Sequence, residues 1–175
     1  MWAAAEPAVS QQQPPQTKKS SPQPPTLRGR ALRLLGRREF SRQELDQRLR
    51  AYAENPQALE ALLDDLAERG WLSDVRYADA VVRKRKGQFA RRAIAQELKQ
   101  AGVAIEVTDA ALAEIDPDAE FAAALALCRR KFRHVPVDQK DKARQIRFLQ
   151  SRGYGLSLAL RVLKHGSDPN PENGQ

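Results

Sequence analysis

The sequence predicts an all-α protein in which three tandem three-helix, helix-turn-helix-like repeats form an elongated, curved array. Three observations support this fold class. Apolar residues recur at helical spacing through the middle of the chain, and no segment alternates as a half-buried strand does. Helix start and stop signals divide that region into short pieces. Apolar positions also recur about every 50 residues, which is the mark of a repeat protein.

Helix start signals place the N-termini of several segments. Ser41 with Glu44 three residues later has the spacing of a capping box, in which each side chain bonds the other residue's backbone N–H. Asn55-Pro56 and Asp116-Pro117 each combine an N-cap residue with a proline at the first helical position. These pairs predict helices that begin at about 41, 56 and 117.

Glycines are expected to end three of the helices. Gly70 follows an apolar stripe of leucines, and Gly102 and Gly153 follow similar stripes in the later repeats. The aromatic residues after two of these glycines, Trp71 and Tyr154, are expected to pack back on their helices. Together the signals predict nine helices with short connections, near residues 28–37, 41–52, 56–69, 74–86, 90–101, 104–115, 117–132, 139–152 and 155–164.

Internal alignment groups these helices in threes. An offset of 49 residues and a further offset of 51 bring like residues together. The matched pairs include Phe40 with Phe89, Leu45 with Ile94, Leu49 with Leu98, Leu98 with Leu149, Gly102 with Gly153, and Leu112 with Leu163. The expected units are residues 27–73, 74–116 and 117–165, with a disordered Pro/Gln/Ser-rich leader over 1–26 and a disordered tail over 166–175.

Charge points to a polyanionic partner. The chain has 30 Lys and Arg against 22 Asp and Glu, a formal net charge of +8. That surplus favours nucleic acid or an acidic protein surface and does not choose between them. Basic residues gather in runs that form the candidate binding surface: Arg83, Lys84, Arg85, Lys86, Arg91, Arg92, Arg129, Arg130, Lys131, Arg133, Lys140, Lys142, Arg144 and Arg147.

Catalytic, metal and cofactor sites find no support in the residue pattern. Cys128 lies in an Ala-rich helix and is expected to be a buried small hydrophobe. His134 and His165 are too isolated for a zinc site, and Asp64-Asp65 is expected to face solvent. A single cysteine, no long apolar stretch and no secretory signal predict a cytoplasmic protein. The pattern contains no catalytic constellation and no Gly-rich phosphate loop, so we expect a protein that is not an enzyme and takes no metal or cofactor.

Four segments resemble the RecX family in the family's own order and cover about residues 28–164. They are RALRLLGRREFSRQELDQRL (Arg30–Leu49), LAERGWLSDVRYADAVVRKR (Leu66–Arg85), FARRAIAQELKQAGV (Phe89–Val103) and KARQIRFLQSRGYGLSLALRVLK (Lys142–Lys164). The resemblance implies tandem three-helix units that lie along the groove of the RecA–DNA filament. It also implies inhibition of RecA ATP hydrolysis, strand exchange and co-protease activity.

A rival interpretation is a basic helical protein that binds DNA without RecA. The third helix of the second unit, AIEVTDAALAEI, argues against a base-reading role because it is acidic and apolar. A helical scaffold that does not bind DNA would leave the positive charge unexplained. The partners expected are therefore the RecA nucleoprotein filament and, weakly and without sequence preference, nucleic acid. A monomer is expected because no heptad seam is present.

Overall fold

The computed structural model describes residues 25–166, and over that range the chain is helical without a strand, as predicted. The disorder predicted for the two ends concerns residues that lie outside this range, apart from Pro25, Thr26 and Gly166. Thr26 is the N-cap of the first helix, and Gly166 is the last residue of the last helix, two residues beyond its predicted end.

Nine α-helices and one short 3-10 helix make up the described residues, and each α-helix lies within a few residues of its predicted position. They are α1 (Leu27–Leu35), α2 (Arg42–Leu49), η1 (Arg50–Tyr52), α3 (Pro56–Glu68), α4 (Asp74–Arg85), α5 (Arg91–Gln100), α6 (Ile105–Ala113), α7 (Pro117–Phe132), α8 (Gln139–Ser151) and α9 (Leu156–Gly166).

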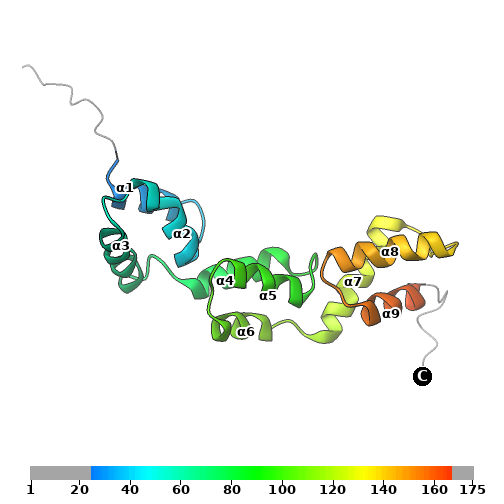
Figure 1. Ribbon diagram of the computed structural model, residues 1–175. Coiled ribbons are helices and arrows are strands. Elements are labelled where there is room, and N and C mark those ends of the chain that lie inside the picture. Colours follow the sequence, from blue (N-terminus) through cyan, green and yellow to red (C-terminus); the bar gives the residue numbers. More distant parts are fainter. Residues whose placement is uncertain (1–24, 167–175) are drawn as a thin grey trace, which may run out of the picture.

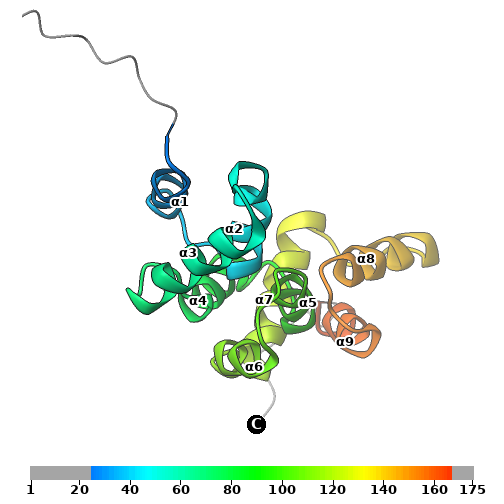
Figure 2. The ribbon, with the colours of Figure 1, turned by 60° about the vertical axis from the view of Figure 1, so that its left-hand side comes forward.

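The helices follow one another in groups of three along an elongated molecule (Figure 1). The group α1–α3 lies at one end, α4–α6 in the middle and α7–α9 at the other end. Figure 2 shows the same succession from a second direction. The shape arises because each group buries its own apolar residues and meets only its neighbours in the chain.

Each group of helices has its own hydrophobic cluster. The residues aligned by the internal repeat occupy matching places in these clusters, and Leu49, Leu98 and Leu149 are each at most 1% exposed. Leu45 and Ile94, the pair one turn earlier, are fully buried. The third cluster also takes in Ala90, which belongs to the start of α5. The repeat visible in the sequence is therefore a repeat of core positions.

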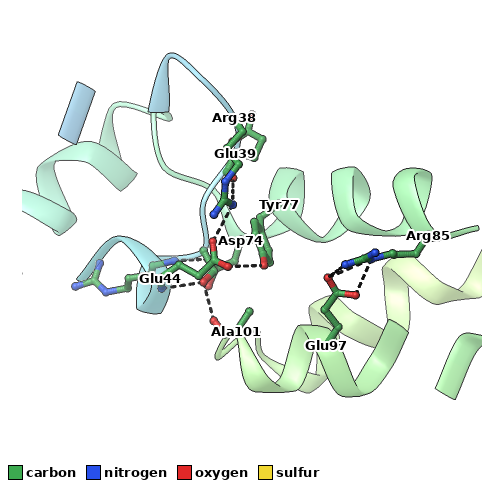
Figure 3. A network of polar contacts seen from close by, with 10 residues as sticks. Arg38, Glu39, Glu44, Asp74, Tyr77, Arg85, Glu97 and Ala101 are labelled. Atoms are coloured by element: carbon green, nitrogen blue, oxygen red, sulfur yellow. Dashed lines mark hydrogen bonds and ion pairs between the residues drawn. The ribbon is translucent and has the colours of Figure 1, made fainter. Parts of the chain in front are cut away.

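The junctions between groups repeat as well. At the first, the Ser41 hydroxyl donates to the carbonyl oxygen of Ala101 at 2.7 Å (Figure 3). At the second, the backbone N–H of Ala90 donates to the carbonyl oxygen of Arg152 at 2.9 Å. Both bonds join the start of the middle helix in one group to the helix-ending turn of the next. Equivalent positions thus make the same contact with different donors.

A second bond at each junction involves the first N–H of the same helix. The N–H of Arg42 donates to the Asp74 carboxylate at 2.8 Å, and the N–H of Arg91 donates to the Glu120 carboxylate at 2.9 Å. These N–H groups have no partner within their own helices, and a carboxylate there also complements the positive end of the helix dipole. Both acceptors come from the first helix of the following group.

Glycine at the helix-ending turn is required for close approach at the second junction. Gly153 has a φ of +87°, a left-handed conformation that favours glycine. A Cβ atom at this position would lie 2.6 Å from the Cβ of Ala93 on α5. Gly102 ends α5 in the same conformation, and a Cβ there would meet the side chain of Gln43. These helix ends agree with the prediction.

The predicted capping box at Ser41 is only half formed. Ser41 accepts a hydrogen bond from the N–H of Glu44 at 3.1 Å, as expected. The Glu44 carboxylate is instead bonded by Arg38 at 2.9 Å and by the Tyr77 hydroxyl at 3.1 Å (Figure 3). Burial and the nearby Glu44 charge raise the pKa of Tyr77 to about 12. The capping box is only half formed because two side chains outside α2 bind the Glu44 carboxylate.

Candidate functional site

The predicted basic residues of the second group lie where α4 ends and α5 begins. Arg83 and Lys84 in the last turn of α4 and Lys86 just after it are exposed. Arg91 and Arg92 open α5, and Arg92 is exposed while Arg91 is partly buried. Positive charge at the end of α4 is favoured by its helix dipole, but at the start of α5 it is not. The helix dipole therefore does not account for the two cations at the start of α5.

Arg85 differs from its neighbours because its charge is used within the protein. Its guanidinium makes a two-pronged contact with the Glu97 carboxylate, with Nε and Nη2 at 2.9 and 2.8 Å from its oxygens (Figure 3). This bond raises the pKa of Arg85. The pair ties α4 to α5, so Arg85 positions the basic group and is poorly placed to bind a partner.

The third group carries its cations at the end of α7 and along α8. Arg129, Arg130 and Lys131 are exposed in the last turn of α7, and Arg133 follows in a left-handed conformation at φ +54°. On α8 the predicted residues are all exposed: Lys140, Lys142, Arg144 and Arg147. Arg144 is again an exception, because it pairs with the largely buried Asp141 at 2.7 Å.

Two cavities lie beside four of these cations. Arg129 and Arg133 line one of about 380 Å³, and Lys140 and Arg144 line another of about 330 Å³. His134 borders both of them. The sequence-predicted residues thus form one basic group on α4–α5 and a second on α7–α8. The two groups belong to successive units of the array.

One basic cluster was missed by the sequence analysis. Four arginines line a cavity of about 290 Å³ in the first group, together with Leu34, Leu49 and Tyr52: Arg30, Arg33, Arg37 and Arg48. The available signal was the spacing of Arg30, Arg33 and Arg37, which places the three on one side of a helical segment.

The cysteine and the acidic pair that were considered as catalytic candidates make contacts within the fold. Cys128 is buried with its sulfur 3.6 Å from the Gln145 side-chain oxygen, and burial raises the pKa of the thiol. Asp64 pairs with Arg42 at 2.6 Å, and Asp65 pairs with Arg28 and Arg69. No group of metal-ligating side chains occurs among the residues that the structure covers.

The two aromatic residues that follow glycines have different surroundings. Tyr154 is buried, as expected, at 3% exposure. Trp71 is 44% exposed, and the guanidiniums of Arg28 and Arg69 lie 5.6 and 5.8 Å from its ring centre. The ring of Trp71 is therefore only partly covered, whereas that of Tyr154 is enclosed. No helix in the described part of the chain has the length and apolar character needed to cross a membrane.

Comparisons with known proteins give a consistent result. Family models described as the second and third three-helix domains of RecX match residues 73–112 and 118–163. A regulatory protein RecX from Neisseria meningitidis serogroup A is 39% identical over 149 residues, which cover 85% of this chain and 96% of the relative. One from Chromobacterium violaceum is 40% identical over 82% of this chain and 92% of its own length. The crystal structure of RecX from Lactobacillus salivarius superposes with a TM-score of 0.66 at 15% identity, covering 79% of this chain and 93% of that one.

Proposed function

The chain belongs to the RecX family of regulatory proteins, and from this premise we propose that it is a non-enzymatic regulator that binds the RecA–DNA filament. On binding, it restrains RecA ATP hydrolysis, strand exchange and co-protease activity. The protein acts as a monomer in the cytoplasm.

The observation that carries this proposal is the spacing of the unpaired cations along an elongated body. One basic group lies on α4–α5 and the next on α7–α8, in successive units of the array. A helical filament presents the same acidic or phosphate surface again at each protomer. Repeated basic groups on a long body suit such a repeating target, whereas one compact patch would suit a single site.

The test is DNA-dependent ATP hydrolysis by RecA, titrated with this protein well below one molecule per RecA protomer. Arg83→Glu/Lys84→Glu alters the first group, and Arg129→Glu/Arg130→Glu alters the second. Lys99→Glu/Lys164→Glu is the matched control, because these two exposed lysines lie outside both groups and the charge change is the same. We expect wild type and control to inhibit at low ratio, and each group variant to need at least about tenfold more protein.

Inhibition that survives reversal of both groups would contradict the proposed surfaces. Absence of inhibition by the wild type, with DNA binding intact, would overturn the RecA proposal and favour the alternative of a basic helical DNA-binding protein that acts without RecA. The exposed cations favour that alternative to the extent that they suit phosphates as well as protein carboxylates. Sedimentation velocity of the full chain tests the monomer.

A further inference from the structure

The arginine-lined cavity of the first group lies between α1, α2 and η1. Arg30, Arg33 and Arg37 come from α1 and the turn after it, and Arg48 comes from α2. Leu34 and Leu49 supply apolar wall, and Tyr52 of η1 completes the lining. No carboxylate lines the cavity. This is a concave surface with four positive charges and no internal counter-charge.

These four arginines differ from the other arginines in this part of the chain, because they are not ion-paired. Every other arginine within residues 25–76 is paired with a carboxylate: Arg28 and Arg69 with Asp65, Arg38 with Glu44, Arg42 with Asp64, Arg50 with Asp46, and Arg76 with Glu39. The cavity arginines make no ion pair in the described structure. Gathering like charges is unfavourable, so an anion that entered the cavity would relieve the repulsion.

The side chains around the cavity are partly fixed in place. The Nε of Arg30 donates to the carbonyl oxygen of Pro25 at 3.2 Å, and its guanidinium lies 4.0 Å from the ring centre of Tyr52. The guanidinium of Arg48 lies 5.4 Å from the ring centre of Phe40. Guanidiniums held against aromatic rings lose less freedom when they bind a planar or tetrahedral anion. Arg33 and Arg37 are exposed and make neither kind of contact.

Tyr52 indicates which anion fits. It is 55% exposed although the guanidinium of Arg30 lies over its ring, so part of the ring remains open to a partner. A base of a single strand can stack on such a ring while the neighbouring phosphate meets the arginines. A duplex offers no free base face, and an acidic peptide would engage the arginines but make no use of the exposed part of the ring. The combination favours single-stranded nucleic acid.

We propose that this cavity is a single-strand binding site, in which Arg30, Arg33, Arg37 and Arg48 hold a phosphate and Tyr52 stacks on an adjoining base. The site deepens the nucleic-acid part of the proposed function, and it rests on that function only for the expectation that nucleic acid is bound at all. It lies on the first unit, away from the basic groups of α4–α5 and α7–α8.

The experiment measures fluorescence anisotropy of a labelled oligothymidylate with the full chain, at several salt concentrations and without RecA. Arg33→Glu/Arg37→Glu is compared with Lys99→Glu/Lys164→Glu, which changes charge equally at exposed sites outside the cavity. We expect the cavity variant to bind at least about tenfold more weakly, with a salt dependence less steep by about 1.4 in log–log slope for two lost contacts. The control should stay near wild type.

Tyr52→Ala tests the stacking step separately. We expect about fivefold to hundredfold weaker binding, with Tyr52→Phe near wild type, because stacking needs the ring and not the hydroxyl. Thermal melting followed by circular dichroism confirms that each variant is folded. Inorganic phosphate should compete only weakly, because it offers no base.

Three results would overturn the proposal. Equal losses in the cavity and control variants would mean that overall charge alone attracts the strand. Full binding by Tyr52→Ala would remove the base contact, and tight, cavity-dependent binding of polyglutamate would assign the site to an acidic peptide. RecA inhibition is measured for the same variants to separate the two proposals. A cavity variant that loses oligothymidylate binding and still inhibits RecA supports the strand site without involving it in filament regulation. A wild type that binds the strand at the cavity and does not inhibit RecA overturns the proposed function alone.

Discussion

Several arginines are made unavailable to a partner by carboxylates that lie far along the chain from them. Glu97, which pairs with Arg85, is 12 residues away, and Glu39, which pairs with Arg76, is 37 residues away. Residue spacing within one helix does not reveal such pairs. The basic runs could therefore be found in the sequence. The pair of Arg144 with Asp141, three residues apart on one helix, follows a local spacing, but the pair of Arg85 with Glu97 could not be predicted in this way.

A buried hydroxyl gives a prediction at this scale. Ser41 caps α2 and also bonds Ala101 across the first junction, and it is fully buried. Ser41→Ala should lower the free energy of unfolding by about 2–3 kcal/mol, because it removes a cap and leaves a buried carbonyl without its donor. Urea unfolding measures the loss.

Ser73 provides the control for this prediction. It caps α4 with a 3.3 Å bond from the N–H of Arg76, and its hydroxyl makes no bond across a junction in the described structure. Ser73→Ala should cost about 1 kcal/mol or less. Equal costs for the two substitutions would show that the hydrogen bond to Ala101 adds nothing to stability.

At the scale of the helix, ends are better specified than partners. Asn55 caps α3 through a 2.7 Å bond from the N–H of Ala58, as its pairing with Pro56 predicts. Such signals act over three or four residues, so a sequence displays them in full. Glu44 shows the opposite case, since Arg38 and Tyr77 take its carboxylate away from the local cap.

The turn after α8 gives a prediction for a whole element. Gly153→Ala should cost about 3 kcal/mol in free energy of unfolding, because it combines a strained left-handed backbone with a clash against Ala93 on α5. The loss should appear as faster hydrogen exchange in both α8–α9 and the start of α5. Gly70→Ala is the matched substitution, with φ +70° and open space around it.

Gly70→Ala should cost only about 1–2 kcal/mol, the price of the backbone strain alone. If the two glycine variants unfold with the same free energy, the close approach at the second junction does not contribute. The contrast is informative because both glycines end helices in the same conformation and differ in what surrounds them.

At the scale of the molecule, the sequence predicted the number of units but not the surfaces between them. The period near 50 residues follows from core positions, which must repeat if the units are alike. The cavity of the first unit depends on how α1 packs beside α2, and no periodicity encodes that angle. The sequence therefore does not predict that the four arginines around the cavity form a cluster.

Separate cores predict separate stability. Leu149 is fully buried in the third cluster, and Leu149→Ala should cost that unit about 2–5 kcal/mol. Hydrogen exchange should accelerate strongly in α7–α9 and by less than about tenfold in α1–α3. Leu45→Ala in the first cluster should reverse the pattern. Uniform acceleration along the chain in either variant would show that the array unfolds as one body.

The two junctions share one rule of attachment: the start of a middle helix receives the turn and the first helix of the unit that follows. Because each junction uses the same contacts, this attachment does not limit the number of units in an array. Duplication of a unit within the gene would add a unit with the same junction contacts, and neither neighbouring unit would need new ones. The reach of such a protein can therefore change in whole steps during evolution, while each core is inherited intact.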